Sequence, residues 1–266
     1  MYSQQNFVED KDTYYLYEDK PITDEILEEM KKYKKVYFGD CFNQSVDNLP
    51  NSITHINFGY SFNQSLDKLP STMQSIYIGT NNKFIQPLDN LPEGLVELDL
   101  NSCINFNLPI NKLPSSLVKL KLGCEFQQSV DNLPSNLKIL SFGWYYDTPI
   151  DNLPASLEEL YLGEKFNQNV DFLPIGLKKL VFNSYFDKSV DNLPLNLEYL
   201  AFGFYFNQPI DNLPKRIESI IFDNHFNQNL NNLSCKLKQI IFKKNGEFNK
   251  LLDINKLPKG LLIKYV

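Results

Sequence analysis

Short hydrophobic triplets recur along most of the chain, with polar residues between their members. In residues 95–100, Leu95, Leu98 and Leu100 are apolar and the residue between the last two is polar. Alternation with a period of two residues is typical of a short β-strand that buries one face. Residues 117–122 and 157–162 repeat the same spacing. The sequence therefore predicts a series of short, equivalent strands.

A Leu-Pro step precedes most of these triplets and sets the length of an internal repeat. Leu233-Ser234 occupies the equivalent place once, so that the chain contains eleven units, and a typical unit reads F-N-Q-S-V-D-N-L-P-x-x-L-x-x-L-x-F-G-x-x. Most steps are 20 residues apart, and the others are 22 or 24 residues apart. An aromatic residue opens every unit and should form a buried spine: Phe42, Phe62, Phe84, Phe106, Phe126, Tyr146, Phe166, Phe186, Phe206, Phe226 and Phe248.

One unit of about 20 residues cannot bury the apolar face of its own strand, whereas stacked units can. The segment between strands is too short and too rich in Asn, Asp and Pro for a helix. A glycine follows most triplets, where a sharp turn can require a positive φ. We therefore predict a mainly β, curved, right-handed solenoid of about eleven repeats of 20–24 residues, with a concave parallel sheet and irregular turns outside.

Residues 1–41 precede the repeat array at 42–266 and are predicted to cap it. Pro21, Thr23 and the following acidic residues resemble the start of a helix, which we place at 24–34. We expect a further strand at 13–17 and the first repeat strand at 35–38. A solenoid needs such a cap because its terminal core would otherwise face water.

The repeat resembles known families. The triplet pattern is similar to the strand of a leucine-rich repeat. More specifically, Phe-Asn followed by V/I-D-N-L-P and L-x-x-L-x-F-G resembles the FNIP repeat of amoebae and of large DNA viruses that infect them, over residues 42 to about 258. The resemblance implies a repeat protein that binds other proteins, and a viral source is one expectation. Some FNIP proteins also carry an amino-terminal F-box that recruits a ubiquitin ligase, but only about 41 residues precede the array here.

Composition excludes several classes of function. The net charge is −6, from 26 basic and 32 acidic residues, and Arg216 is the one arginine. We therefore expect no binding of nucleic acid and no membrane association. The amino terminus has no secretory signal and no segment is long enough to span a membrane. Together with four widely spaced cysteines, this predicts a cytoplasmic protein, in the host cytoplasm if the protein is viral.

No motif predicts catalysis, a cofactor or a metal site. His55 and His225 lie far apart in the repeat order, and no phosphate-binding glycine loop or Cys-x-x-Cys pair occurs. An aspartate recurs in the turn of most units, and these carboxylates could bind Ca²⁺ or serve in Asx-turns, of which we favour the second. Repetition of one unit also argues against an enzyme, because a catalytic site needs unlike residues at one place.

Aromatic residues point to the surface that could bind a partner. From the fifth repeat onward they occupy outward strand positions and the turns just past the glycine, and interfaces favour such side chains. The predicted partner site is on the concave face and comprises Trp144, Tyr145, Tyr161, Tyr185, Tyr199 and Tyr205. The competing interpretation is that aromatic residues are simply good strand formers.

The carboxyl end predicts self-association. Residues 261–266 read as an apolar strand, and an unpaired edge strand tends to pair with another chain. We expect a homodimer through this edge, with Leu262, Ile263 and Val266 in contact. The sequence thus favours a non-catalytic scaffold for protein interactions, with a ubiquitin-ligase adaptor or a self-assembling structural protein as alternatives.

Overall fold

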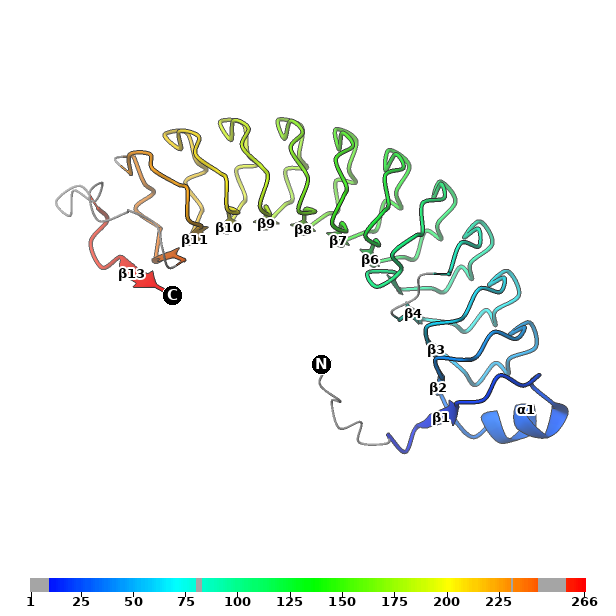
Figure 1. Ribbon diagram of the computed structural model, residues 1–266. Helices are drawn as coiled ribbons and strands as arrows, with labels where there is room; N and C mark the ends of the chain where they lie inside the picture. The colour runs from blue at the N-terminus through cyan, green and yellow to red at the C-terminus, as the bar shows by residue number, and fades with distance from the viewer. Residues whose placement is uncertain (1–9, 80–82, 231, 244–256) are drawn as a thin grey trace.

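A computed structural model describes residues 10–79, 83–230, 232–243 and 257–266 of the chain. They form one curved solenoid whose strands belong to a single sheet of thirteen parallel strands in sequence order (Figure 1). The sheet lines the inner, concave side of the arc and the turns form the outer side. The predicted fold class is confirmed.

The strands are three or four residues long, as the triplets predict. The first two are β1 (Thr13–Leu16) and β2 (Lys35–Phe38), and helix α1 (Asp24–Met30) lies between them in sequence. The repeat strands that follow are β3 (His55–Phe58), β4 (Ser75–Ile78), β5 (Glu97–Asp99), β6 (Lys119–Lys121), β7 (Ile139–Ser141), β8 (Glu159–Tyr161), β9 (Lys179–Val181), β10 (Tyr199–Ala201), β11 (Ser219–Phe222), β12 (Gln239–Phe242) and β13 (Leu262–Tyr265).

The core lies between the sheet and the outer turns. Within a strand such as β8 the central Leu160 is buried while its two neighbours are half-buried on the opposite face. The buried residues of successive strands pair directly, for example Leu160 with Leu180. Because every unit adds the same apolar residues, one continuous core runs along the solenoid.

The predicted aromatic spine is present from Phe42 to Phe226. Neighbouring rings of the spine stack in parallel, with centroids 6.0 Å apart for Phe186 and Phe206 and 6.5 Å apart for Tyr146 and Phe166. Strands in a sheet are only about 4.8 Å apart. The wider spacing of the rings places the sheet on the inside of the curve. Phe248 lies outside the described residues.

A ladder of polar side chains runs beside the spine. In most units the residue after the spine aromatic accepts a hydrogen bond from the backbone of the next unit, as when Asn43 Oδ1 accepts the Asn63 N–H at 2.8 Å. Gln64 donates its side-chain amide to the same oxygen. Ile85, which follows Phe84, has no side-chain acceptor. The ladder satisfies backbone groups that the turns leave without a partner.

Strand β1 and helix α1 precede β2 at the amino-terminal end, and their boundaries differ from the expected ones. β1 pairs with β2 and ends at Leu16, and α1 ends at Met30 instead of residue 34. The helix stops early because residues 31–34 turn back toward β2, where the Lys34 carbonyl accepts hydrogen bonds from the next unit. The hydroxyl of Thr23 accepts the Ile26 N–H, and Met30 is fully buried against the core.

Close approach of backbones explains the glycine that follows most strands. Of the described glycines, Gly260 has a positive φ, so the positive φ expected at the strand ends is wrong. A Cβ on Gly143 would instead lie 2.0 Å from the Gly123 carbonyl oxygen of the preceding unit. Asn183 occupies the equivalent position of a later unit, where its amide donates to the Leu162 carbonyl.

Candidate functional site

Two ladders of side chains cover the concave face. They arise because the first and third residues of each strand point away from the core, and the parallel register aligns them across the sheet. The first ladder consists of Thr13, Lys35, His55, Ser75, Glu97, Lys119, Ile139, Glu159, Lys179, Tyr199, Ser219, Gln239 and Leu262. The second consists of Tyr15, Tyr37, Asn57, Tyr77, Asp99, Lys121, Ser141, Tyr161, Val181, Ala201, Ile221, Ile241 and Lys264.

Charges in the middle of the concave face pair with one another. Lys119 Nζ lies 2.6 Å from a carboxylate oxygen of Glu97, and Lys121 Nζ lies 2.6 Å from one of Asp99. Asp99 is buried, and its hydrogen bond raises the pKa of Lys121. In each pair the two charges on neighbouring strands neutralise each other. The aromatic residues are therefore the feature that distinguishes one part of the concave face from another.

Tyr161 and Tyr199 of the predicted partner site lie half-buried on β8 and β10. Lys179, on the strand between them, places its ammonium 4.9 Å from the centroid of the Tyr161 ring and 5.2 Å from that of Tyr199. The Tyr161 hydroxyl donates to Glu159 at 2.6 Å, and burial raises the pKa of Tyr161. These contacts hold the two rings in place, and both side chains stay partly exposed.

The other predicted residues lie in the turns that follow the strands, along one rim of the sheet. Trp144, Tyr145, Tyr185 and Tyr205 expose between 42% and 50% of their surface. Tyr185 and Tyr205 contact each other with ring centroids 5.2 Å apart. The structure thus separates the predicted residues into a pair on the strands and a set on the rim.

Three further residues, Phe204, His225 and Lys165, extend this set into a rim cluster. The His225 ring lies 4.5 Å from that of Phe204 and 5.2 Å from that of Tyr205. On the other side, Lys165 Nζ lies 3.6 Å from the centroid of the Tyr185 ring. Sequence register places Phe204 and His225 on this rim, but it cannot show that their rings meet.

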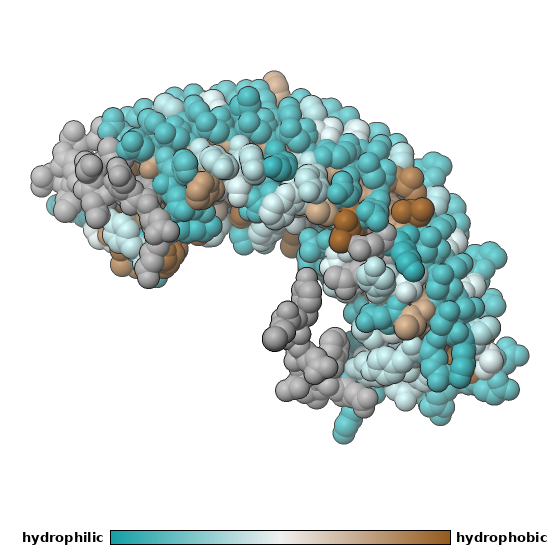
Figure 2. All heavy atoms as spheres, in the orientation of Figure 1, coloured by the Kyte–Doolittle hydropathy of each residue, from teal (hydrophilic) through white to brown (hydrophobic). Residues whose placement is uncertain are grey.

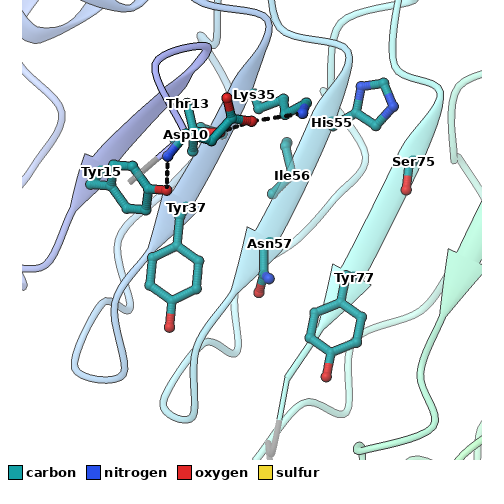
Figure 3. A pocket seen from close by; sticks show the side chains of 11 residues that line it. Asp10, Thr13, Tyr15, Lys35, Tyr37, His55, Ile56, Asn57, Ser75 and Tyr77 are labelled. Carbon is teal, nitrogen blue, oxygen red and sulfur yellow. Dashed lines mark hydrogen bonds and ion pairs between the residues drawn. The ribbon is translucent and has the colours of Figure 1, made fainter. Parts of the chain in front are cut away.

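A depression at the amino-terminal end of the concave face was not predicted (Figure 3). Its volume is about 310 Å³. The lining residues are Asp10, Thr13, Tyr15, Lys35, Val36, Tyr37, His55, Ile56, Asn57, Ser75 and Tyr77. The rings of Tyr15 and Tyr37 are 5.8 Å apart, whereas the short Asn57 side chain separates Tyr37 from Tyr77.

Polar groups give this depression a defined shape. Lys35 Nζ lies 2.8 Å from the Asp10 carboxylate, and the Asp10 backbone N–H donates to the Tyr15 hydroxyl. Burial, followed by the nearby Lys35 ammonium, lowers the pKa of His55. In the sequence, the one indication of this depression is that Tyr37 and Tyr77 occupy the same ladder. Tyr15 completes the lining, but its place there depends on the pairing of β1 with β2.

Several of the turn aspartates accept hydrogen bonds from the following unit. The Asp131 carboxylate accepts from the Asn152 amide at 3.0 Å and from the Ser129 hydroxyl at 2.7 Å. The Asp131 N–H donates to that same hydroxyl, so the serine and not the aspartate closes the turn. In the described part of the chain, no three His, Cys, Asp or Glu side chains come together in a group able to hold a metal ion.

The carboxyl-terminal strand presents part of the predicted self-association edge. β13 pairs with β12, and Ile263 packs against the core. Leu262 and Val266 expose 50% and 58% of their surface. The structure thus brings Ile263 into the solenoid and leaves the other two residues available for contact.

Comparison with known proteins defines the class of the chain. The crystal structure of CroV588, a circular LRR protein from a giant virus, matches it with a TM-score of 0.83 and 33% sequence identity. The match covers 95% of this chain but 39% of CroV588. YopM from Yersinia enterocolitica WA-314 also matches, with a TM-score of 0.48, 19% identity and coverage of 88% and 60%. The chain is a solenoid of the leucine-rich-repeat type.

The family model for the FNIP Repeat matches residues 42–81, 126–165 and 166–205. The chain is therefore an FNIP repeat-containing protein, and the resemblance noted in its sequence is confirmed. No curated protein sequence matches the chain. In the described ranges, no helix has the length and hydrophobicity needed to cross a lipid bilayer.

Proposed function

We propose that this chain is a non-catalytic recognition scaffold that binds a protein partner on its concave face. The observation that carries the proposal is the composition of that face. Charged residues near its centre pair with one another, whereas the strand tyrosines on either side of the centre are only half-buried. Tyrosine supplies large contact area with little loss of conformational freedom, and a rigid sheet loses little entropy on binding.

Two parts of the concave face are candidates for the contact. One is the predicted site, with Tyr161 and Tyr199 on the strands and Tyr185 and Tyr205 on the rim. The other is the amino-terminal depression around Tyr37 and Tyr77. A long partner could cover both, since they line one continuous sheet.

A pair of matched variants tests the proposal. The full chain is used to capture partners from cell lysate, and the partner is then titrated against Tyr161→Ser/Tyr199→Ser and against Tyr37→Ser/Tyr77→Ser. We expect at least one variant to lose about tenfold or more in affinity. Tyr60→Ser, at an exposed tyrosine outside both sites, is the control and should bind normally. Unchanged affinity of both double variants would refute recognition by the concave face.

Self-association is a second candidate function, favoured by the exposure of Leu262 and Val266 at β13, the last strand of the sheet in the described part of the chain. Light scattering at micromolar concentration should then show a dimer, and Leu262→Lys/Val266→Lys should convert it to a monomer. A monomeric parent chain would contradict this candidate. The role as a ubiquitin-ligase adaptor gains no support from the described residues, in which α1 is the one helix.

A further inference from the structure

The turns that precede β9 and β10 depart from the repeat pattern in a way that the proposed function does not use. Phe172 stands where every other unit has Asn or Lys. Ile175 and, one unit later, Leu195 stand where the other units have polar or small residues, Cys235 among them. These three side chains expose 67%, 58% and 68% of their surface.

The three exposed apolar side chains lie on two neighbouring turns, and we treat them together as one patch. Phe172 and Ile175 belong to the same turn, and Leu195 occupies the register position of Ile175 in the next unit. The Asn196 side-chain amide donates to the Ile175 carbonyl at 3.0 Å and so joins the two turns. The outer surface that Figure 2 shows is mostly hydrophilic. Exposed apolar residues that cluster in this way are typical of interaction sites.

A carboxylate without a partner lies beside the patch. Asp171 accepts a hydrogen bond at 3.0 Å from Asn192 of the following unit, and Asp191 accepts one from Asn212 at the same distance. The residue of the following unit that would donate to Asp151 is Phe172, which has no side-chain amide. In the described part of the chain, the exposed Asp151 carboxylate has no hydrogen bond and no ion pair.

Pro149 removes the second usual partner of Asp151. In the preceding unit the equivalent residue is Ser129, whose hydroxyl donates to Asp131 at 2.7 Å. Proline has no side-chain donor. The same stretch of sequence therefore exposes apolar side chains and frees the carboxylate next to them.

The charges around the patch favour one kind of partner. Lys68 and Lys112 neutralise aspartates in early units, at 3.1 and 3.4 Å, but the row from Asp131 to Asp211 has only neutral amides or hydroxyls as partners. Such a row repels anionic lipid and attracts basic residues. Lys215 and Arg216 lie one unit beyond Leu195 and make that end of the patch basic. Asp151, at the opposite end, makes the other end acidic.

We propose that Phe172, Ile175 and Leu195, with Asp151 at their edge, form a second docking surface for a protein segment that carries apolar side chains next to a lysine or arginine. The apolar residues of the segment cover the patch, and its cation pairs with Asp151. Because the patch lies in the turns and not on the strands, a partner on the concave face leaves it accessible.

The test uses a displayed library of random peptides, panned against the full chain. A variant with Phe172→Asn, Ile175→Ser and Leu195→Ser restores residues that other units carry, so its fold should be kept. We expect recovered peptides to combine apolar residues with Lys or Arg and to bind this variant at least about tenfold more weakly. Asp151→Asn should weaken the same peptides about threefold and reduce the dependence of binding on salt.

Ile85→Asn is the matched control, because Ile85 is 52% exposed in a distant unit and also replaces an asparagine. It should leave peptide binding unchanged. Four results would overturn the proposal: no enriched peptide, enriched peptides without basic residues, equal binding to the restored variant, or equal loss in Ile85→Asn. Self-association that the restored variant abolishes would also overturn it, because the occupant would then be a second copy of the chain.

Discussion

In most units the side chain that follows the spine aromatic connects two units through one oxygen atom. Asn207 Oδ1 accepts the backbone N–H of Asn227 at 2.8 Å and the amide of Gln228 at 3.1 Å. Register identifies this position in the sequence, but neither spacing nor composition shows that its oxygen reaches the next unit. The ladder became evident only with the structure.

Asn207→Ala should therefore destabilise the chain more than loss of an ordinary surface amide. The change removes the acceptor of the Asn227 N–H and one of the two acceptors of the Gln228 amide, for which we expect a loss of about 1–2 kcal/mol in the free energy of unfolding. Urea denaturation measures it. The control is Asn212→Ala, which removes one exposed hydrogen bond to Asp191 and should change stability by about 0.5 kcal/mol or less. Equal effects of the two variants would contradict the role of the ladder.

Tyr146 is the one tyrosine in the described spine, and its hydroxyl is buried without a hydrogen-bond partner. Burial raises the pKa of this phenol strongly, so the group stays neutral. Tyr146→Phe should keep the stacking on Phe126 and Phe166 and stabilise the chain by up to about 1 kcal/mol. The reverse change, Phe166→Tyr, should destabilise it, and a Tyr146→Phe variant less stable than the parent in urea would contradict this account.

Asp19 begins the ladder in the cap and gives it a pH dependence. Its carboxylate accepts from Gln44 at 2.7 Å and from the Asn43 N–H at 2.9 Å, and these bonds lower its pKa. A lowered pKa in the folded state stabilises the fold above the ordinary aspartate pKa, and this contribution is lost as the pH falls through the folded value.

Asp19→Asn keeps both acceptor bonds without the charge. The difference in cap stability between parent and variant should therefore shrink as the pH falls from about 6 to about 3. Hydrogen exchange of amides in β1 and β2 measures this difference. If the difference in cap stability between parent and variant instead grew toward low pH, the Asp19 charge would not stabilise the cap in the way described.

Short strands were the most predictable elements, because the buried triplet recurs with a fixed register. The boundaries of α1 were less predictable. The apolar stripe continues to Tyr33, yet the chain must leave the helix after Met30 in order to enter β2 at Lys35. In the cap, the need to connect α1 to β2 therefore determines where the helix ends, and the local apolar pattern does not.

Each unit depends on its two neighbours for a buried face, so damage to one unit should stay local. Phe186 is fully buried between Phe166 and Phe206, and Phe186→Ala should lower stability by about 3–5 kcal/mol. Hydrogen exchange should show faster opening of β8 to β11 and unchanged protection of β3 and β4. Uniform loss of protection along the chain would contradict nearest-neighbour stabilisation.

At the scale of the whole molecule, the arc and its concave sheet follow from the repeat, but the choice of binding surface does not. All units present the same two outward strand positions, so only the residues that differ between units can mark a site. The rim cluster needs contacts between side chains of several units, and the amino-terminal depression needs Tyr15 from the cap. Both are properties of the stacked array, which no single unit of sequence contains.

Hydroxyl-radical footprinting of the complex with a captured partner tests the central claim most directly, because it reports the solvent exposure of aromatic side chains. Recognition by the concave face predicts lower labelling of Tyr161 and Tyr199, or of Tyr37 and Tyr77, while Tyr60 is labelled as in the free chain. Unchanged labelling of all four concave tyrosines in a saturated complex would contradict the claim.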